Sequence, residues 1–145
     1  MAPRIVISSD HGGFELKDKL VQYLEAKPVD LLDLGVHTAE SVDYPDRAHA
    51  VAEAVLSKQA DFGIVICGTG IGVSMAANRH RGIRAALCTD PYMARMSRAH
   101  NDANVLCLGG RIISPSLAEE IVDAFLSGAF DGGRHARRIE KIEIQ

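Results

Sequence analysis

The sequence predicts one α/β domain, an open three-layer sandwich in which a five-stranded parallel sheet carries helices on both faces. Short runs rich in Ile, Val and Leu alternate with segments whose apolar residues recur at the helical period. Such runs are typical of strands buried on both faces, and their alternation with helices indicates right-handed crossovers between parallel strands. The 145 residues suit a single domain over residues 1–145, and 47% hydrophobic residues suffice for a core.

Each expected strand is short and is followed by glycine or a polar turn. The expected strands span residues 4–8, 30–34, 62–67, 83–88 and 105–108. Helices are expected over residues 14–24, 48–56, 93–99 and 117–125, where apolar side chains share one face. Ser114 and Pro115 are typical of the start of the last of these helices, and Gly128 of its end.

Composition and charge exclude several classes of function. The net charge of −3 and the absence of a long basic run argue against a nucleic-acid-binding protein. We expect no membrane span and no secretory leader, because no apolar stretch is long enough and the N-terminal pattern is absent. Cys67, Cys88 and Cys107 are widely spaced and odd in number, so we expect neither disulfides nor a zinc site. A cytoplasmic location with reduced thiols follows.

Ligands of open α/β sheets bind outside the carboxyl ends of the strands, so the residues that follow the strands are candidates for the site. These segments bring together an Asp, one or two His, a Cys, a Thr and a glycine-rich loop. We expect them to gather at one edge of the sheet. Residues 8–13, 67–72 and 89–91 follow expected strands, and residues 100–102 lie near the fifth.

The glycine-rich loop carries Gly68, Gly70 and Gly72 and directly precedes an expected helix. Successive backbone N–H groups in such a loop bind a phosphate or a developing oxyanion. The loop is neither a P-loop nor the dinucleotide fingerprint, because no Gly-Lys-Ser/Thr follows and Val73 occupies the third glycine position. The alternative interpretation is a tight strand-to-helix turn with no ligand.

Cys67 ends a strand and precedes that helix, where the helix dipole favours a thiolate. No Asp or Glu occurs between Phe62 and Thr89, so a base supplied by this loop must be Cys67. The alternative is an inert core cysteine, which is the interpretation that we adopt for Cys88 and Cys107.

Three polar groups elsewhere have both a structural and a functional interpretation. Asp10 caps a helix or faces a ligand, and His11 beside it is placed to donate to a phosphate or sugar oxygen. His100 stabilises a helix C-terminus or belongs to an exposed polar site with Asn101. In the basic tail, Arg134 and Arg138 share one helical face, which suits either a phosphate or a solvated surface.

In combination, these motifs resemble the type B ribose-5-phosphate isomerase family, which also includes the galactose-6-phosphate isomerase subunits. The resemblance covers nearly the whole chain and rests on SDHGG at 9–13, DYP at 43–45, CGTGIG at 67–72, HNDAN at 100–104 and GRH at 133–135. It implies a Rossmann-like sandwich and a homodimer, or a dimer of such dimers, in which the partner subunit completes each active site. It also implies a sugar phosphate as substrate, and we expect no metal and no cofactor.

The resemblance assigns roles to individual residues. Cys67 would remove the proton from C2, Thr69 would assist proton movement between the oxygens, and Asp10 and His100 would serve substrate binding and ring opening. The substrate-binding set would comprise His11, Tyr44, Gly68, Gly70, Ile71, Gly72, Asn101, Arg111, Arg134, His135 and Arg138. One branch of the family replaces the Cys with Ser and uses a Glu as base. This chain keeps Cys67 and has Ile71 at the place of that Glu, so it resembles the cysteine branch.

Two other hypotheses remain open at this stage. A flavodoxin-like module would hold a nucleotide or flavin in the glycine loop and would tolerate loss of Cys67. A phosphosugar-responsive protein would keep the pocket without turnover. Within the isomerase hypothesis, ribose 5-phosphate is the default substrate, and allose, galactose or erythrulose phosphates are alternatives.

Overall fold

The computed structural model describes residues 2–144 and forms one five-stranded parallel sheet between two layers of helices. The strand order is β2-β1-β3-β5-β4, and every pairing is parallel. The fold class predicted from the sequence is therefore confirmed. The strands are β1 (Arg4–Ser9), β2 (Asp30–Asp33), β3 (Phe62–Cys67), β4 (Ala85–Leu87) and β5 (Val105–Gly109).

Six helices connect and follow these strands in the described part of the chain. The four helices expected from periodicity are present, as are the one after the glycine loop and the one carrying the basic tail. They are α1 (Phe14–Glu25), α2 (Tyr44–Leu56), α3 (Ile71–Ala77), α4 (Pro91–Asn101), α5 (Pro115–Leu126) and α6 (Arg134–Glu140).

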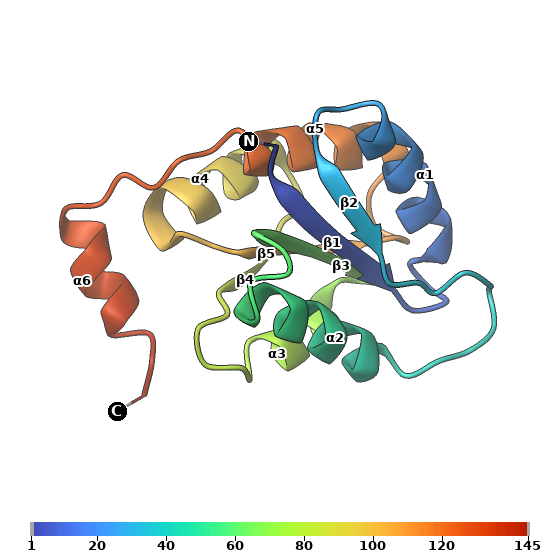
Figure 1. Ribbon diagram of the computed structural model, residues 1–145, viewed down its shortest axis with the longest axis horizontal. Coiled ribbons are helices and arrows are strands. Elements are labelled where there is room, and N and C mark those ends of the chain that lie inside the picture. Colours follow the sequence, from blue (N-terminus) through green and yellow to red (C-terminus); the bar gives the residue numbers. More distant parts are fainter. Residues whose placement is uncertain (1, 145) are drawn as a thin grey trace.

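The two faces of the sheet bury separate hydrophobic clusters, because successive side chains of a strand point to opposite sides. On β1, Ile5 and Ile7 pack with α1, α4 and α5, whereas Val6 packs with α2 and α3. Figure 1 shows these two helical layers, with the sheet between them. Helix α6 stands apart from both layers and makes its helix contacts with α4.

Local capping explains where several helices begin. The Asp90 side chain accepts the Met93 N–H at 2.8 Å and starts α4. The Ser114 hydroxyl accepts the Leu117 N–H at 3.2 Å, so the predicted cap of α5 is confirmed. Helix α2 begins at Tyr44, four residues before its first buried apolar residue, because proline in its first turn suits a helix start.

A partly buried ion pair fixes α1 to the sheet. Lys17 lies on α1 with its side chain fully buried, and its Nζ is 2.8 Å from the Asp33 carboxylate at the end of β2. A buried ammonium is tolerated only when it is paired and hydrogen-bonded. This pair therefore sets how α1 meets the edge of the sheet.

Among residues 2–144, no helix combines the length and apolarity that crossing a membrane requires.

Candidate active site

The candidate site lies where β1, β3 and β5 end. The chain leaves β1 toward one edge of the sheet and leaves β3 toward the other, so the topological switch point falls between these two strands. Backbone hydrogen bonds join the loops there: Asp10 N–H donates to the Ile66 carbonyl at 3.1 Å, and Gly110 N–H donates to the Cys67 carbonyl at 2.8 Å. Asp10 and Cys67 are thus neighbours at the switch point, as the sequence predicted.

Cys67 is the last residue of β3 and is 6% exposed. Its sulfur accepts a hydrogen bond from the Gly70 N–H at 3.1 Å, a donor suited to a thiolate. Gly70 has φ of +81°, and a Cβ there would lie 2.5 Å from Leu87 Cδ1. Only glycine fits this position, so the tight turn and the amide that it directs at sulfur have the same cause.

Thr69 and Tyr44 border the same loop. Thr69 Oγ1 accepts the Ile71 N–H at 3.2 Å and supports the start of α3. The Tyr44 ring lies against Gly72 so closely that a Cβ at Gly72 would be 2.4 Å from the ring. The loop from β3 to α3 therefore packs against the first turn of α2, and Tyr44 is in the site region as expected.

Asp10 and His11 form the turn after β1. Asp10 is nearly buried and accepts the Gly13 N–H at 3.1 Å, so its carboxylate closes this turn rather than capping α1, whose N-cap is Gly13. His11 Nδ1 accepts the Val42 N–H at 3.2 Å, which leaves Nε2 as the ring N–H. His11 and Arg111 line one cavity of about 190 Å³, and both present donors to it.

Arg111 lies over the glycine loop. Its backbone N–H donates to the Gly68 carbonyl at 3.0 Å, and a Cβ added to Gly68 would be 3.2 Å from a guanidinium nitrogen of Arg111. With the ring of His11 on the same cavity, this cation is placed to bind an anion beside Cys67.

His100 and Asn101 do not join this group within one chain, and the expectation of a single gathering is wrong. They end α4, and the Asn101 carbonyl accepts from Arg84 Nε at 3.0 Å, next to the first residue of β4. A helix that follows a parallel strand runs back along the sheet, so its C-terminus lies at the opposite end of the strands, where they begin. The length of β5, about 13 Å, separates this end of the sheet from the end that carries Cys67.

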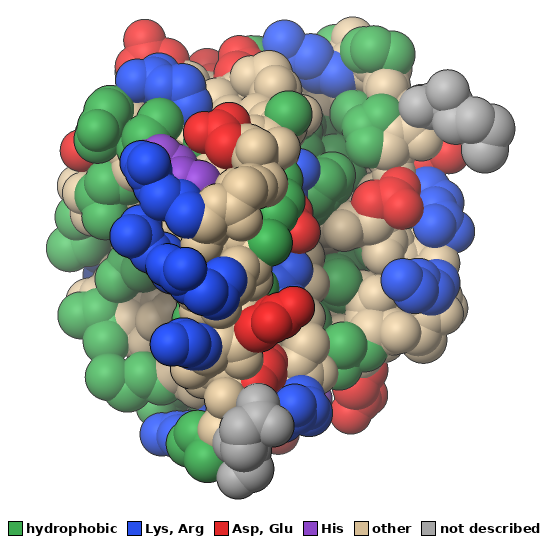
Figure 2. Space-filling model, turned by 90° about the vertical axis from the view of Figure 1, so that its left-hand side faces the viewer, with side chains coloured by type: hydrophobic (Ala, Val, Ile, Leu, Met, Phe, Trp, Pro, Cys, Tyr) green, Lys and Arg blue, Asp and Glu red, His purple; other side chains and the backbone are tan. Residues whose placement is uncertain are grey.

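The basic tail lies beside His100 at this end of the sheet, where the strands begin. His100, Asn101, His135 and Arg138 line a cavity of about 330 Å³ with residues 139 and 142. Figure 2 shows a band of basic side chains beside a histidine on the face that carries α6. The predicted site residues thus fall into two groups, one around Cys67 and one around His100.

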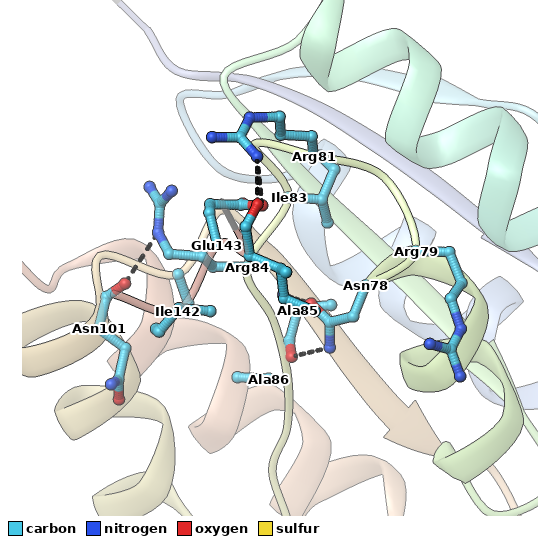
Figure 3. A pocket seen from close by; sticks show the side chains of 12 residues that line it. Asn78, Arg79, Arg81, Ile83, Arg84, Ala85, Ala86, Asn101, Ile142 and Glu143 are labelled. Atoms are coloured by element: carbon cyan, nitrogen blue, oxygen red, sulfur yellow. Dashed lines mark hydrogen bonds and ion pairs between the residues drawn. The ribbon is translucent and has the colours of Figure 1, made fainter. Parts of the chain in front are cut away.

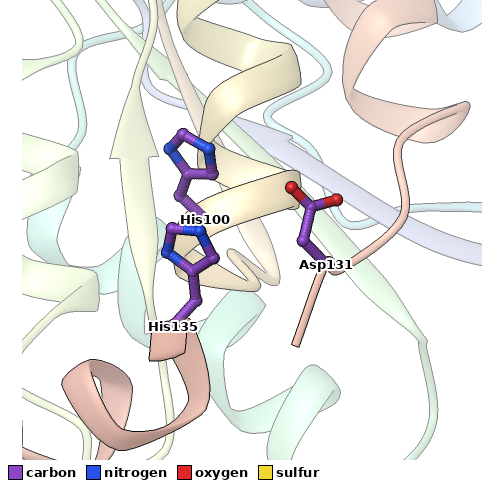
Figure 4. A group of neighbouring side chains, drawn as sticks. All are labelled: His100, Asp131 and His135. Carbon is purple, nitrogen blue, oxygen red and sulfur yellow. The ribbon is translucent and has the colours of Figure 1, made fainter. Parts of the chain in front are cut away.

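The second group contains a carboxylate–histidine cluster that the sequence analysis did not find. The His100 and His135 rings stack with centroids 4.3 Å apart, and ligand atoms of both and of Asp131 lie within 4.8 Å of one another (Figure 4). Partial burial lowers the pKa of His135, and the neighbouring His100, Arg134 and Arg138 act in the same direction. Asp131 was missed because it meets His100 only through the fold, although it stands four residues before His135.

A cavity of about 540 Å³ adjoins the second group and was also not foreseen. It separates the end of α3 and β4 from the C-terminal segment, and Asn101 and Ile142 line both cavities. Arg81 pairs with Glu143, and the Glu143 carboxylate accepts the Gly82 N–H at 3.0 Å (Figure 3). These contacts hold the segment after α6 against the body.

The other two thiols are buried, as the sequence predicted: Cys107 lies in β5 and Cys88 directly follows β4. Burial raises the pKa of the Cys88 thiol to about 11 and also raises the pKa of Cys107. Both thiols therefore stay protonated at neutral pH and are unsuited to act as a base.

A family model described as Ribose/Galactose Isomerase matches residues 5–142. The chain belongs to this family. Among curated relatives, ribose-5-phosphate isomerase B of Escherichia coli is 48% identical over 139 residues, which are 96% of this chain and 93% of the relative. A putative sugar phosphate isomerase of Rickettsia prowazekii is also 48% identical, over 96% of both chains.

Solved structures agree with this assignment. A ribose 5-phosphate isomerase of Thermotoga maritima superposes with a TM-score of 0.96 at 58% identity, covering 98% of both chains. Ribose-5-phosphate isomerase B of Clostridium thermocellum gives 0.95 at 56% identity, covering 96% of this chain and 94% of the other. This member of the ribose/galactose isomerase family is therefore an isomerase with the fold of the type B enzymes.

Proposed function

We propose that this isomerase interconverts ribose 5-phosphate and ribulose 5-phosphate through an enediolate, with Cys67 as the base. The observation that carries the proposal is the Cys67 sulfur at the switch point, 3.1 Å from the Gly70 N–H and directly before the glycine loop. The names of the E. coli and T. maritima relatives support ribose 5-phosphate as the substrate.

The reaction moves a proton between adjacent carbons. The Cys67 thiolate takes the C2 proton of the open-chain aldose, the C–H electron pair forms the C1–C2 double bond, and the C1 carbonyl π pair moves to O1 to give the enediolate. Returning a proton to C1 gives the ketose and restores the thiolate. In this mechanism Thr69 would pass the proton from O2 to O1, and the amides around Gly70 would stabilise the oxyanion, each such donor contributing about 3 kcal/mol.

Phosphate binding uses cations away from the reacting carbons, which orients those carbons against the base. His11 and Arg111 supply such donors next to the glycine loop. The remaining phosphate ligands would be Arg134, His135 and Arg138. These residues lie with His100 at the end of the sheet where the strands begin. A site that uses both groups must therefore draw them from two chains.

A homodimer with shared sites meets this requirement. Several exposed large apolar side chains surround the end of the sheet that carries Cys67. They lie at the starts of α2 and α4, on α3 and in the loop after β5: Tyr44, Ile71, Met75, Tyr92, Met93 and Ile112. An apolar rim around a polar site is typical of a surface that a partner covers. In the dimer, the His100 group of each subunit would complete the Cys67 site of the other.

Turnover of the purified protein on ribose 5-phosphate tests the proposal, run beside four- and six-carbon sugar phosphates. Cys67→Ala should abolish isomerisation and Cys88→Ala should not, because Cys88 is buried and protonated. In ²H₂O, the product should gain deuterium at the carbon that receives the returned proton. A faster rate on an allose, galactose or erythrulose phosphate would keep the mechanism and change the substrate. Full activity without the Cys67 thiol would reject the mechanism.

A further inference from the structure

Three metal-ligating side chains meet where α4 ends and the chain enters α6. His100 comes from the last turn of α4, His135 from the first turn of α6, and Asp131 from the segment between α5 and α6. Figure 4 shows the two imidazoles one above the other with the Asp131 carboxylate directed toward them. Segments far apart in the sequence thus bring two ring nitrogens and one carboxylate oxygen within 4.8 Å of one another.

The backbone holds these segments together without the side chains. The Asp131 N–H donates to the Ala99 carbonyl at 2.9 Å, which anchors the loop directly beside His100. The His135 N–H donates to the Gly132 carbonyl at 3.1 Å and closes the turn that joins Asp131 to α6. The main chain therefore keeps the three side chains close together, and an ion would require only their side chains to reorient.

Two imidazole nitrogens and one carboxylate oxygen form a donor set that zinc uses with a fourth position open to water. In a tetrahedral site with ligand bonds near 2.0–2.1 Å, ligand atoms lie about 3.3 Å apart. The ligand atoms of the cluster lie within 4.8 Å of one another, so binding would require them to approach by up to about 1.5 Å through reorientation of the side chains. A hard cation such as Mg²⁺ is disfavoured, because it prefers an octahedron of oxygens.

We propose that His100, Asp131 and His135 form a binding site for a divalent transition-metal ion of the zinc type. The imidazoles supply neutral donors, and Asp131 supplies the negative charge that offsets the cationic surroundings. Arg134 and Arg138 on α6 are exposed and close to His135, so they oppose cation binding. The site is accordingly weaker than a closed structural zinc site, and it suits reversible occupancy.

Metal binding would have a consequence for catalysis, and this consequence rests on the proposed function. An ion held by His100 and His135 removes both rings from substrate binding and ring opening. Zinc would then inhibit the isomerase by occupying these two rings. The binding itself requires no assumption about the reaction.

Calorimetric titration of metal-free protein with ZnCl₂ tests the binding directly. One ion per chain is expected, with perturbed NMR signals of the His100 and His135 rings and no response to MgCl₂. Asp131→Asn and His135→Gln should each weaken zinc at least about tenfold. His49→Gln is the control, because His49 and His80 form the other close histidine pair, with ring nitrogens 2.7 Å apart. Absence of binding, unchanged affinity in both cluster variants, or loss in His49→Gln would overturn the site.

Inhibition separates this proposal from the proposed function. Measured against its own metal-free turnover, Asp131→Asn should show a zinc inhibition constant that rises from the parent value by the same factor as its dissociation constant. If the metal-free protein shows no turnover but binds zinc through the cluster, the reaction is wrong and the metal site stands. If turnover is normal and titration detects no zinc, the metal site is wrong and the reaction stands.

Discussion

The Gly70 N–H donates to the sulfur of Cys67 across 3.1 Å, and the left-handed backbone of Gly70 is what aims it there. Gly70→Ala should therefore damage both the loop and the site, because its Cβ would lie 2.5 Å from Leu87 Cδ1 and 2.9 Å from the Leu108 carbonyl carbon. We expect kcat to fall at least about 100-fold and the free energy of unfolding to fall by about 1–3 kcal/mol.

Gly82→Ala is the matched control for Gly70→Ala. Gly82 also has positive φ, +92°, but its nearest neighbour is the flexible end of Leu56 at 3.1 Å, and it lies outside the Cys67 loop. It should lose stability and keep turnover. Equal losses of kcat in the two variants, measured by steady-state kinetics beside urea unfolding, would contradict the role given to the Gly70 amide.

Mixing two inactive variants tests whether sites are shared between subunits. Cys67→Ala and His100→Ala homodimers should each be inactive, because every site lacks one group. After unfolding and refolding together, a mixed dimer regains one site with both groups intact. Random pairing predicts recovery of about a quarter of the parental activity. No recovery, with mixed dimers shown by native mass spectrometry, would mean that Cys67 and His100 do not meet across subunits.

The Lys17–Asp33 pair should dominate the stability contributed by ion pairs. Asp33→Ala leaves the fully buried Lys17 ammonium without its main partner, so we expect a loss of about 3 kcal/mol in the free energy of unfolding. Asp61→Ala removes the exposed partner of Arg4 and should cost less than about 1 kcal/mol. Urea denaturation of both variants measures the difference, and equal losses would contradict the importance of burial.

Cys88 should make stability depend on pH in the alkaline range. Its thiol has a pKa of about 11 in the folded chain, against 9.0 for an ordinary thiol, so folding favours the protonated form. The stabilisation is complete below pH 9 and is lost as the pH rises through 11. At pH 10 the contribution has fallen by about 1 kcal/mol.

Cys88→Ala should flatten this alkaline decline relative to the parent chain, as measured by urea unfolding at pH 8, 9.5 and 11. Cys67→Ala serves as the comparison, because it removes a thiol at the end of a strand outside the Cys88 environment. Identical pH profiles for the Cys88 variant and the parent would show that the Cys88 thiol does not titrate differently on unfolding.

Strands and helices were predictable because their signals are local. The apolar run at 62–67 coincides with β3, and the cap at Ser114 starts α5 where expected. The expected strand at 83–88 is shorter in the structure, where β4 spans Ala85–Leu87. It is an edge strand that pairs with β5 alone, and its ladder ends with Leu87 opposite Cys107. The length of an apolar run therefore does not determine how many of its residues pair with the adjacent strand.

The composition of the candidate site followed from the rule that ligands bind at strand ends, which brought Asp10, His11 and Cys67 together correctly. The same rule was misapplied to His100, which precedes β5 instead of following a strand. Its position at the end of α4 places it at the end of the sheet where the strands begin, because a crossover helix runs back along the sheet. The division of the site residues into two groups follows from that geometry.

The sequence by itself determined the α/β class, the order of its elements, and the glycine loop that follows Cys67 and leads into a helix. These depend on periodicity, on caps and on the backbone freedom of glycine, all of which act over a few residues. Only the tertiary structure decided the strand order, the burial of Lys17 against Asp33, and the approach of Asp131 to His100 and His135. These contacts join segments distant in the chain, and packing of whole elements against the sheet brings them together.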